Sequence, residues 1–229
     1  SSHSIGASTE GIKFAPSLSA DEYGFMRNKE EFLENRIDPA SASNRIMWQT
    51  AYATIYEANA VIEGVRNNTD LTAAARDMME GEARFARAFN YFYLTNLYGD
   101  VPLVLDTDYH TNALLGNTAA TSIYAQIVAD LEWAKERLPA DYSAGDGQRI
   151  RTNHWVCRAF LARVYAYIGE WNLTEAEASA VIGHTDLFEL EGDLGRVFLS
   201  DSREAIWQLY PFPGTRYNAA ERYVTNYNA

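Results

Sequence analysis

Residues 80–104, EGEARFARAFNYFYLTNLYGDVPLV, decide the fold because they combine a helical pattern with a clear stop. Phe85, Phe89 and Phe92 recur at helical spacing and share one face, as a core-facing helix requires. Small residues between the rings allow a neighbouring helix to approach closely. Gly99 offers a left-handed C-cap position and Pro102 cannot continue the helix, so we expect the helix to end there.

The composition of the chain is that of an acidic globular protein. At 229 residues it suits one large domain or two small ones, and its formal net charge of −12 disfavours binding to a phosphate backbone. Aromatic residues make up 13%, including fifteen tyrosines, which exceeds what a helical core usually demands. No apolar run reaches the ~20 residues of a membrane-spanning helix.

The cysteine and histidine pattern indicates neither a metal site nor a catalytic site. Cys157 is the single cysteine, and within a helical pattern it is typical of a small buried hydrophobe. The four histidines lie far apart in the sequence, without metal-ligand spacing. We therefore expect no catalytic residue, no metal and no cofactor.

Further helices are expected to follow one another in pairs. Each pair reads helix, turn, helix, with small residues where the helices cross, which resembles tetratricopeptide stacking with irregular spacing and longer linkers. The fold class is thus mainly α, an irregular tetratricopeptide-like helical-pair solenoid with long loops. Period-2 alternation in 188–199 and 204–218 adds the expectation of a few short strands near the C-terminus. The expected helices span residues 45–65, 72–98, 121–138, 152–168 and 173–183.

Three segments are expected along the chain. Residues 1–43 form an irregular lead segment close to the ligand, residues 44–184 form the helical scaffold, and residues 185–229 begin a loop-rich C-terminal region that is incomplete.

Polar residues within the helical stripes are expected to tie helices to their surroundings. Asn59 interrupts the apolar stripe of its helix, and a buried amide needs a hydrogen-bond partner. A helix-to-loop or helix-to-helix tie is favoured over a ligand contact. Glu80 and Arg84 have the spacing of a surface ion pair, whereas Glu82 and Arg87 can tie their helix to its neighbours.

Four sequence motifs together point to a known family. One consists of EARFARA, YFYL and GDVPL within residues 82–103, and the others are WQTAYATIYEAN (48–59), YAQIVADLEWAKERLP (124–139) and AFLARVYAYIGEW (159–171). The first looks like the hallmark of the SusD/RagB family, which are surface nutrient-binding lipoproteins of Bacteroidetes, and the other three resemble further helices of that family. Members of the family are usually longer, with a lipidated N-terminal cysteine and a large C-terminal region, so we expect this chain to be a fragment or a trimmed protein.

The resemblance implies a receptor without catalytic activity at the surface of the outer membrane. Such a receptor binds an oligosaccharide or another nutrient and delivers it to a SusC-type TonB-dependent transporter, and it is held at the membrane through an N-terminal lipid anchor. Two alternatives stay open, a helical-repeat scaffold for protein interactions and a peptide-binding receptor.

Candidate ligand residues lie on irregular segments. In SADEYGF (19–25), Asp21, Glu22 and Tyr23 match a Ser-Asp-Glu loop of the family, although Asp21 and Glu22 can equally cap a turn. Adjacent carboxylates do not face one another across a glycosidic bond, which disfavours hydrolysis. A second wall, or alternatively packing against a missing region, is expected from Tyr210, Phe212, Arg216, Tyr217, Tyr223 and Tyr227.

Overall fold

The computed structural model describes residues 16–22 and 30–208. These residues fall into two compact units, one within residues 16–50 and the other comprising residues 51–208. The description that follows treats each unit by itself.

The first unit contains two short helical turns, residues 16–19 and α2 (Glu30–Leu33). Leu18 and Phe32 are buried against one another, and the partly buried Met47 packs on them. Tertiary contacts such as this one, rather than helix propensity, hold the turns together, because helices this short are not stable alone.

The second unit is built from helices, as the sequence predicts. Residues from Ala51 onward in α3 belong to it, and the remaining helices follow in chain order. The elements are α3 (Ala42–Asn67), α4 (Ala73–Tyr98), α5 (Tyr109–Asn112), α6 (Ala120–Arg137), η1 (Ser143–Gly145), α7 (His154–Tyr167), α8 (Trp171–Ile182) and η2 (Leu194–Arg196).

Side-chain caps set the starts of these helices. The Thr72 hydroxyl accepts a hydrogen bond from the backbone N–H of Ala75, so Thr72 is the N-cap of α4. Asn153 caps α7 and so places its start after residue 152. Helix α6 starts at Ala120, one residue before the expected start at residue 121, and Asp100 accepts from its first N–H at 2.9 Å.

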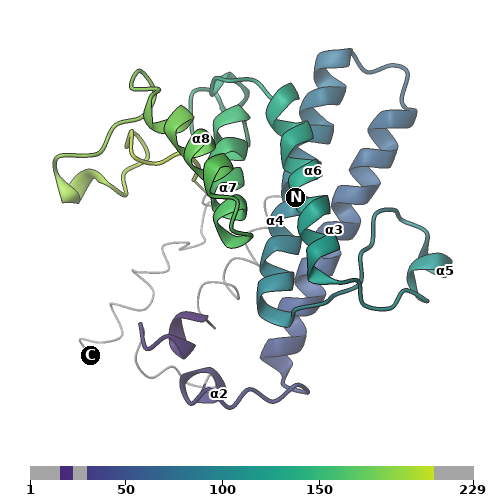
Figure 1. Cartoon of the computed structure of the whole chain (residues 1–229). Helices are drawn as coiled ribbons and strands as arrows, with labels where there is room; N and C mark the ends of the chain where they lie inside the picture. The colour runs from purple at the N-terminus through teal and green to yellow at the C-terminus, as the bar shows by residue number, and fades with distance from the viewer. Residues whose placement is uncertain (1–15, 23–29, 209–229) are drawn as a thin grey trace, which may run out of the picture. The chain divides into compact units, whose positions relative to one another are not determined.

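The helices stack in sequence along the second unit. Helix α4 packs against α6, α6 against α7 and α7 against α8, while Ala58 and Ile62 of α3 contact Ala83 of α4 (Figure 1). At Gly81 a Cβ atom would lie 2.8 Å from Leu138, so the glycine permits the close approach of the end of α6. Helix after helix in antiparallel pairs is the tetratricopeptide-like arrangement expected from the sequence.

The aromatic face of α4 is buried, as the spacing of its rings predicts, and it packs against α7. The ring of Phe160 in α7 lies 5.7, 5.4 and 5.2 Å from those of Phe85, Phe89 and Phe92. Helix α4 then ends at Gly99, whose φ of 75° favours glycine, although its ψ of −123° differs from a left-handed helical residue.

The expected strands near the C-terminus are wrong for the described residues 185–208, which form turns and the short helix η2. Side chains take up backbone groups that a strand ladder would use. Glu204 accepts from the N–H of Glu191, and Glu191 accepts from the N–H of Arg203. Phe188 is buried, but Leu190, Leu194 and Phe198 are exposed, so the alternation does not mark the buried face of a strand here. The rest of the predicted strand region, from residue 209, lies outside the described residues.

None of the helices in the described residues is long and apolar enough to span a membrane.

Candidate functional site

The predicted pair Asp21 and Glu22 forms an exposed corner at the end of a helical turn. Asp21 adopts a left-handed conformation with φ of 58°. Its N–H donates to the carbonyl of Leu18 at 3.2 Å, and the N–H of Glu22 donates to that of Ser17 at 2.9 Å. These two bonds are those of a Schellman C-cap, so the backbone of the pair closes a turn. Both side chains remain exposed.

The same closing motif recurs after α2 and is joined to the first. Asn35 has a φ of 52° and donates its N–H to Phe32, while Arg36 donates its N–H to Glu31. The Asn35 amide donates to the carbonyl of Ser19 at 3.1 Å, and the Ser19 hydroxyl donates to that of Phe32 at 3.0 Å. The corner that carries Asp21 and Glu22 is therefore fixed to a second capped turn.

The remaining predicted ligand residues are not among those that the structure describes. They are Tyr23, Tyr210, Phe212, Arg216, Tyr217, Tyr223 and Tyr227.

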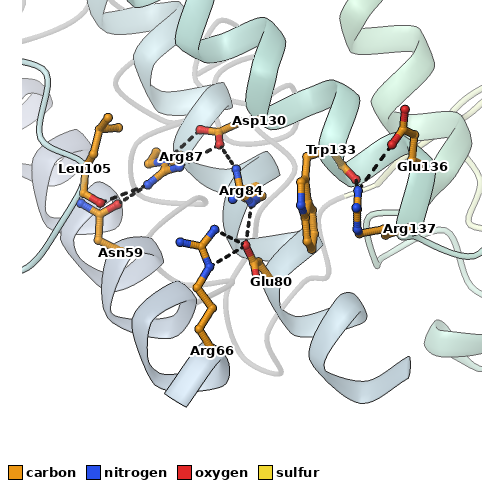
Figure 2. Close-up of polar contacts among 10 residues, drawn as sticks. All are labelled: Asn59, Arg66, Glu80, Arg84, Arg87, Leu105, Asp130, Trp133, Glu136 and Arg137. Carbon is orange, nitrogen blue, oxygen red and sulfur yellow. Dashed lines mark hydrogen bonds and ion pairs between the residues drawn. The ribbon is translucent and has the colours of Figure 1, made fainter. Parts of the chain in front are cut away.

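A buried network of charged side chains joins α4 to α6 (Figure 2). Asp130 is 0% exposed, and its two carboxylate oxygens accept from Nε and Nη2 of Arg87 at 2.8 and 2.7 Å. Arg84 donates to the same carboxylate at 2.7 Å. A bidentate arginine fixes both distance and orientation, so these bonds set how the two helices lie along one another.

The network extends to α3 through Glu80. One oxygen of its carboxylate accepts from Arg66 and from Arg84, at 2.7 and 2.9 Å. Burial alone would raise the pKa of Glu80, but the hydrogen bonds from these two arginines outweigh it and hold the pKa below its usual value. The Arg84 guanidinium also lies 4.6 Å from the Trp133 ring centre, which shields it from water (Figure 2). Glu80 and Arg84 are thus part of a buried tie rather than a surface pair.

Asn59 connects the network to the loop that follows α4. Its carbonyl oxygen accepts from Nη1 of Arg87 at 2.8 Å, and its amide donates to the carbonyls of Val104 and Asp106, each at 3.1 Å. The predicted role of Asn59 is confirmed in both forms, as a tie to a helix and a tie to a loop. Arg87 is confirmed as a tie to neighbouring helices, whereas Glu82 binds Arg151, in the segment that precedes α7, at 2.6 Å.

Other buried side chains hold the same loop. The Tyr52 hydroxyl donates to Pro102 O at 2.8 Å, and the Tyr91 oxygen accepts from the N–H of Val104 at 2.7 Å. Burial raises the pKa of both tyrosines, so their hydroxyls remain protonated at all physiological pH values. Glu63 accepts from both the N–H and the hydroxyl of Thr107. Residues 102–107 therefore follow one path fixed by α3 and α4.

Beyond this anchored part the loop presents apolar side chains to solvent. Asp108 caps the short helix α5, and the side chains of Tyr109 and Leu114 are 76% and 86% exposed. A backbone bridge between Val101 and Thr118 closes the base of the loop. The buried polar side chains of the network thus serve to position an exposed surface.

The network does not have the form of an acid-base site. Asp130 and Glu80 are each bound to two arginines, whereas a general acid or base needs a carboxyl group that exchanges protons near neutral pH. Within residues 16–22 and 30–208, no group of three or more His, Cys, Asp or Glu side chains could hold a metal ion. Asp130 was not predicted, although its place among Ile127, Leu131 and Ala134 on the buried face of α6 is a signal for it.

Stacked helix pairs with a long anchored loop define the class of protein, a tetratricopeptide-like helical scaffold. Residues 16–166 match the model of a SusD-like family that is described as starch-binding and associating with the outer membrane. The match covers more than half of the chain. The protein therefore belongs to the SusD-like family, as the sequence motifs predict.

Known proteins support this assignment. A SusD-like protein P25 of Formosa agariphila is 28% identical over 71% of this chain and 31% of its own length. A solved structure with a xylogluco-oligosaccharide superposes with a TM-score of 0.78 at 20% identity, covering 93% of this chain and 45% of that one. A laminarin-binding SusD-like protein has a TM-score of 0.72 at 20% identity, covering 86% and 46%. The chain spans about a third of the length of this curated relative and less than half of these solved structures.

Proposed function

We propose that this chain is the helical part of a cell-surface receptor that binds an oligosaccharide without cleaving it. The receptor delivers the glycan to a SusC-type TonB-dependent transporter and works as a lipoprotein of the outer membrane. The observation that carries the proposal is family membership over residues 16–166, together with the likeness in fold to structures whose names include a xylogluco-oligosaccharide and laminarin.

The corner at Asp21 and Glu22 is proposed as one part of the ligand site. Its support is geometric, because two exposed carboxylates stand on a backbone held by capped turns. Carboxylates accept hydrogen bonds from sugar hydroxyls, and a fixed backbone reduces the entropy lost on binding. Tyr23, Tyr210, Arg216, Tyr217 and Tyr223 are proposed as further ligand contacts, on their sequence pattern alone.

Binding without cleavage is supported by the state of the buried acids. Hydrolysis of a glycosidic bond requires two carboxyl groups on opposite sides of the sugar. Here Glu80 and Asp130 are buried and bound to arginines, while Asp21 and Glu22 are neighbours in sequence. We expect no new reducing ends after incubation with any glycan that the chain binds, and their appearance would disprove the non-catalytic role.

The loop between α4 and α6 is proposed to contact the transporter. It is fixed at its base by Asn59, Arg87 and Tyr91, and it exposes Tyr109 and Leu114. A preorganised loop with exposed large apolar side chains is typical of a protein-binding surface. This observation also favours the alternative of a protein-interaction scaffold, which would lack the glycan affinity.

Isothermal titration of the chain tests glycan binding. The ligands are malto-oligosaccharides, xyloglucan oligosaccharides and laminarin oligosaccharides, and binding to at least one of them is expected. The double variant Asp21→Asn/Glu22→Gln should weaken that binding by about fivefold, the effect of replacing charged hydrogen-bond acceptors. Asparagine tolerates the left-handed conformation at position 21, so the turn should be retained.

Two results would contradict the proposal. Absence of binding to the whole panel would reject the carbohydrate ligand and leave the protein-interaction scaffold. Unchanged affinity in the double variant would reject the corner as part of the site.

Capture of a SusC-type transporter from outer membranes tests the second partner. The double variant Tyr109→Ser/Leu114→Ser should reduce the amount of transporter captured.

A further inference from the structure

Three tyrosines from three different helices meet around one buried ring at the end of the second unit. Tyr93 belongs to α4, Tyr124 to α6 and Tyr167 to α7, and each ring contacts that of Phe92. The ring-centre distances to Phe92 are 5.3, 6.3 and 4.9 Å, and the planes lie at 88°, 82° and 69° to it. Edge-to-face contacts of this kind restrict ring orientation, so the tyrosines are held in place.

Polar groups accompany these rings at the surface. The Tyr124 hydroxyl donates to the carbonyl oxygen of Asn96 at 3.1 Å, and Arg163 approaches the Tyr93 hydroxyl at 3.5 Å. Asn96 and Arg163 are both exposed, and the side chain of Tyr167 is 61% exposed. We call these five residues, Tyr93, Asn96, Tyr124, Arg163 and Tyr167, the tyrosine platform.

The arrangement has the chemistry of a sugar-binding surface rather than that of a helix core. Tyr93 and Tyr124 are partly buried, whereas Tyr167 is exposed. A core has no need of an exposed phenol ring, and a ring of this size ordered by a buried neighbour offers apolar area to a ligand at little entropic cost. The hydroxyls of Tyr93 and Tyr124 have lone pairs that accept further hydrogen bonds, and the Arg163 guanidinium has five N–H donors, of which the contact to Tyr93 uses one.

We propose that the tyrosine platform binds a pyranose unit of an oligosaccharide. The apolar C–H face of the sugar packs on the Tyr167 ring, while its hydroxyls exchange hydrogen bonds with Tyr124, Asn96 and Arg163. This assignment rests on the proposed function for the class of ligand, but it places that ligand on the ends of α4, α6 and α7. None of its residues belongs to the corner at Asp21 and Glu22.

Substitution of the exposed ring tests the assignment. In titrations of the chain with malto-, xyloglucan and laminarin oligosaccharides, Tyr167→Ala should weaken binding about tenfold, as expected for loss of one stacking contact. Tyr167→Phe keeps the ring and should retain affinity within about threefold. Tyr124→Phe, which removes a hydroxyl and keeps the ring, should weaken binding by about fivefold.

A matched control and a folding check complete the experiment. Tyr56 is 55% exposed and belongs to α3, which contributes no residue to the platform, so Tyr56→Ala should bind like the parent chain. Circular dichroism should give equal helix content for all variants, because Tyr167 is 61% exposed and lies at the last position of α7.

The outcomes separate this inference from the proposed function. If the parent binds a glycan and Tyr167→Ala binds it equally well, the platform is rejected and the proposed function stands. If Tyr167→Ala and Tyr56→Ala weaken binding to the same extent, the effect is not specific to the platform and the inference is likewise rejected. If the parent binds no member of the panel, both are rejected.

Discussion

On one face of α4, Arg84 and Arg87 reach Asp130 of α6, while on another face of the same helix Phe85 and Phe89 pack against Phe160 of α7. The two faces meet different requirements. Ion pairs with bidentate geometry allow one register only, because a shift of the helix breaks several bonds together. Packed rings remove a large apolar area from water, and this contribution does not depend on the direction of individual bonds.

This difference shows which contacts determine how the helices and the loop lie relative to one another. Burying charges costs free energy that their mutual attraction offsets only when every partner is present. Such a network is weak evidence for stability, yet here it links α4 at once to α6, through Asp130, and to the loop, through Asn59. The polar face of α4, formed by Arg84 and Arg87, therefore specifies the position of the loop. The aromatic face, formed by Phe85 and Phe89, supplies much of the free energy that drives folding.

The largest loss of stability is expected from a substitution of Arg87, at the centre of the polar face. Arg87→Met retains side-chain length but leaves Asp130 with Arg84 alone and removes the donor to Asn59. The free energy of unfolding should fall by about 3–5 kcal/mol, as for other broken buried pairs. Urea denaturation followed by circular dichroism measures it.

Arg66 provides the control for that experiment, because its side chain is 52% exposed although it binds the same network. Arg66→Met should change the free energy of unfolding by less than about 1 kcal/mol. Equal losses in the free energy of unfolding for the two variants would show that burial of an arginine does not determine its contribution to stability.

A smaller loss of stability is expected when one ring is removed from the aromatic face. Phe89→Leu keeps an apolar side chain but loses ring contacts to Phe85, Tyr93 and Phe160. The free energy of unfolding should fall by about 1–2 kcal/mol, with no change in the position of the loop. Urea denaturation gives the first quantity, and protection of the loop amides in hydrogen exchange reports the second. Loss of that protection would contradict the separation of the two faces.

The smallest expected effect is a dependence of stability on pH that arises from His154, at the start of α7. Nε2 of His154 accepts from Arg158, so its Nδ1 carries the proton that is donated to the carbonyl of Lys135. Burial, followed by the charges of Arg158 and Lys135, lowers the pKa of His154, whereas the Lys135 carbonyl and Glu177 act in the opposite direction and do not prevail.

The sign of this dependence follows from proton uptake. The unfolded chain binds a proton at His154 more readily, so stability is greatest above the unfolded pKa of about 6.5 and is lost as the pH falls below it. Loss of the Arg158 hydrogen bond should cost on the order of 1 kcal/mol. Thermal unfolding between pH 7.5 and 5 measures the fall, which should be reduced in His154→Gln. The Glu80 carboxyl titrates at lower pH, outside this window.

Local sequence signals predicted the parts of the fold that depend on neighbours in the chain. The spacing of Phe85, Phe89 and Phe92 predicted which face of α4 is buried, and Thr72 marked its start. Asn59 was predicted to be a tie because an amide in an apolar stripe must find a partner. The identity of that partner depends on how the loop folds back, which no local pattern encodes.

Local sequence signals failed where the interacting residues come from distant segments of the chain. Alternation in 188–199 predicted strands, but Glu191 and Glu204 bind the backbone there instead. For Asp21 and Glu22 the sequence left a ligand contact and a turn open, and the bonds to Leu18 and Ser17 show that the backbone of the pair closes a turn. The tyrosine platform combines three helices, so its members look like ordinary helix residues when each is considered alone.

The base of the loop after α4 has a consequence for protein engineering. The bridge between Val101 and Thr118, and the bond from Ala120 to Asp100, keep its two ends side by side independently of what lies between them. Because loop-closure entropy grows only slowly with length, foreign sequence inserted within residues 109–117 should leave the helices intact. The segment is therefore suited to carry an epitope tag or a fluorophore on a scaffold of known geometry.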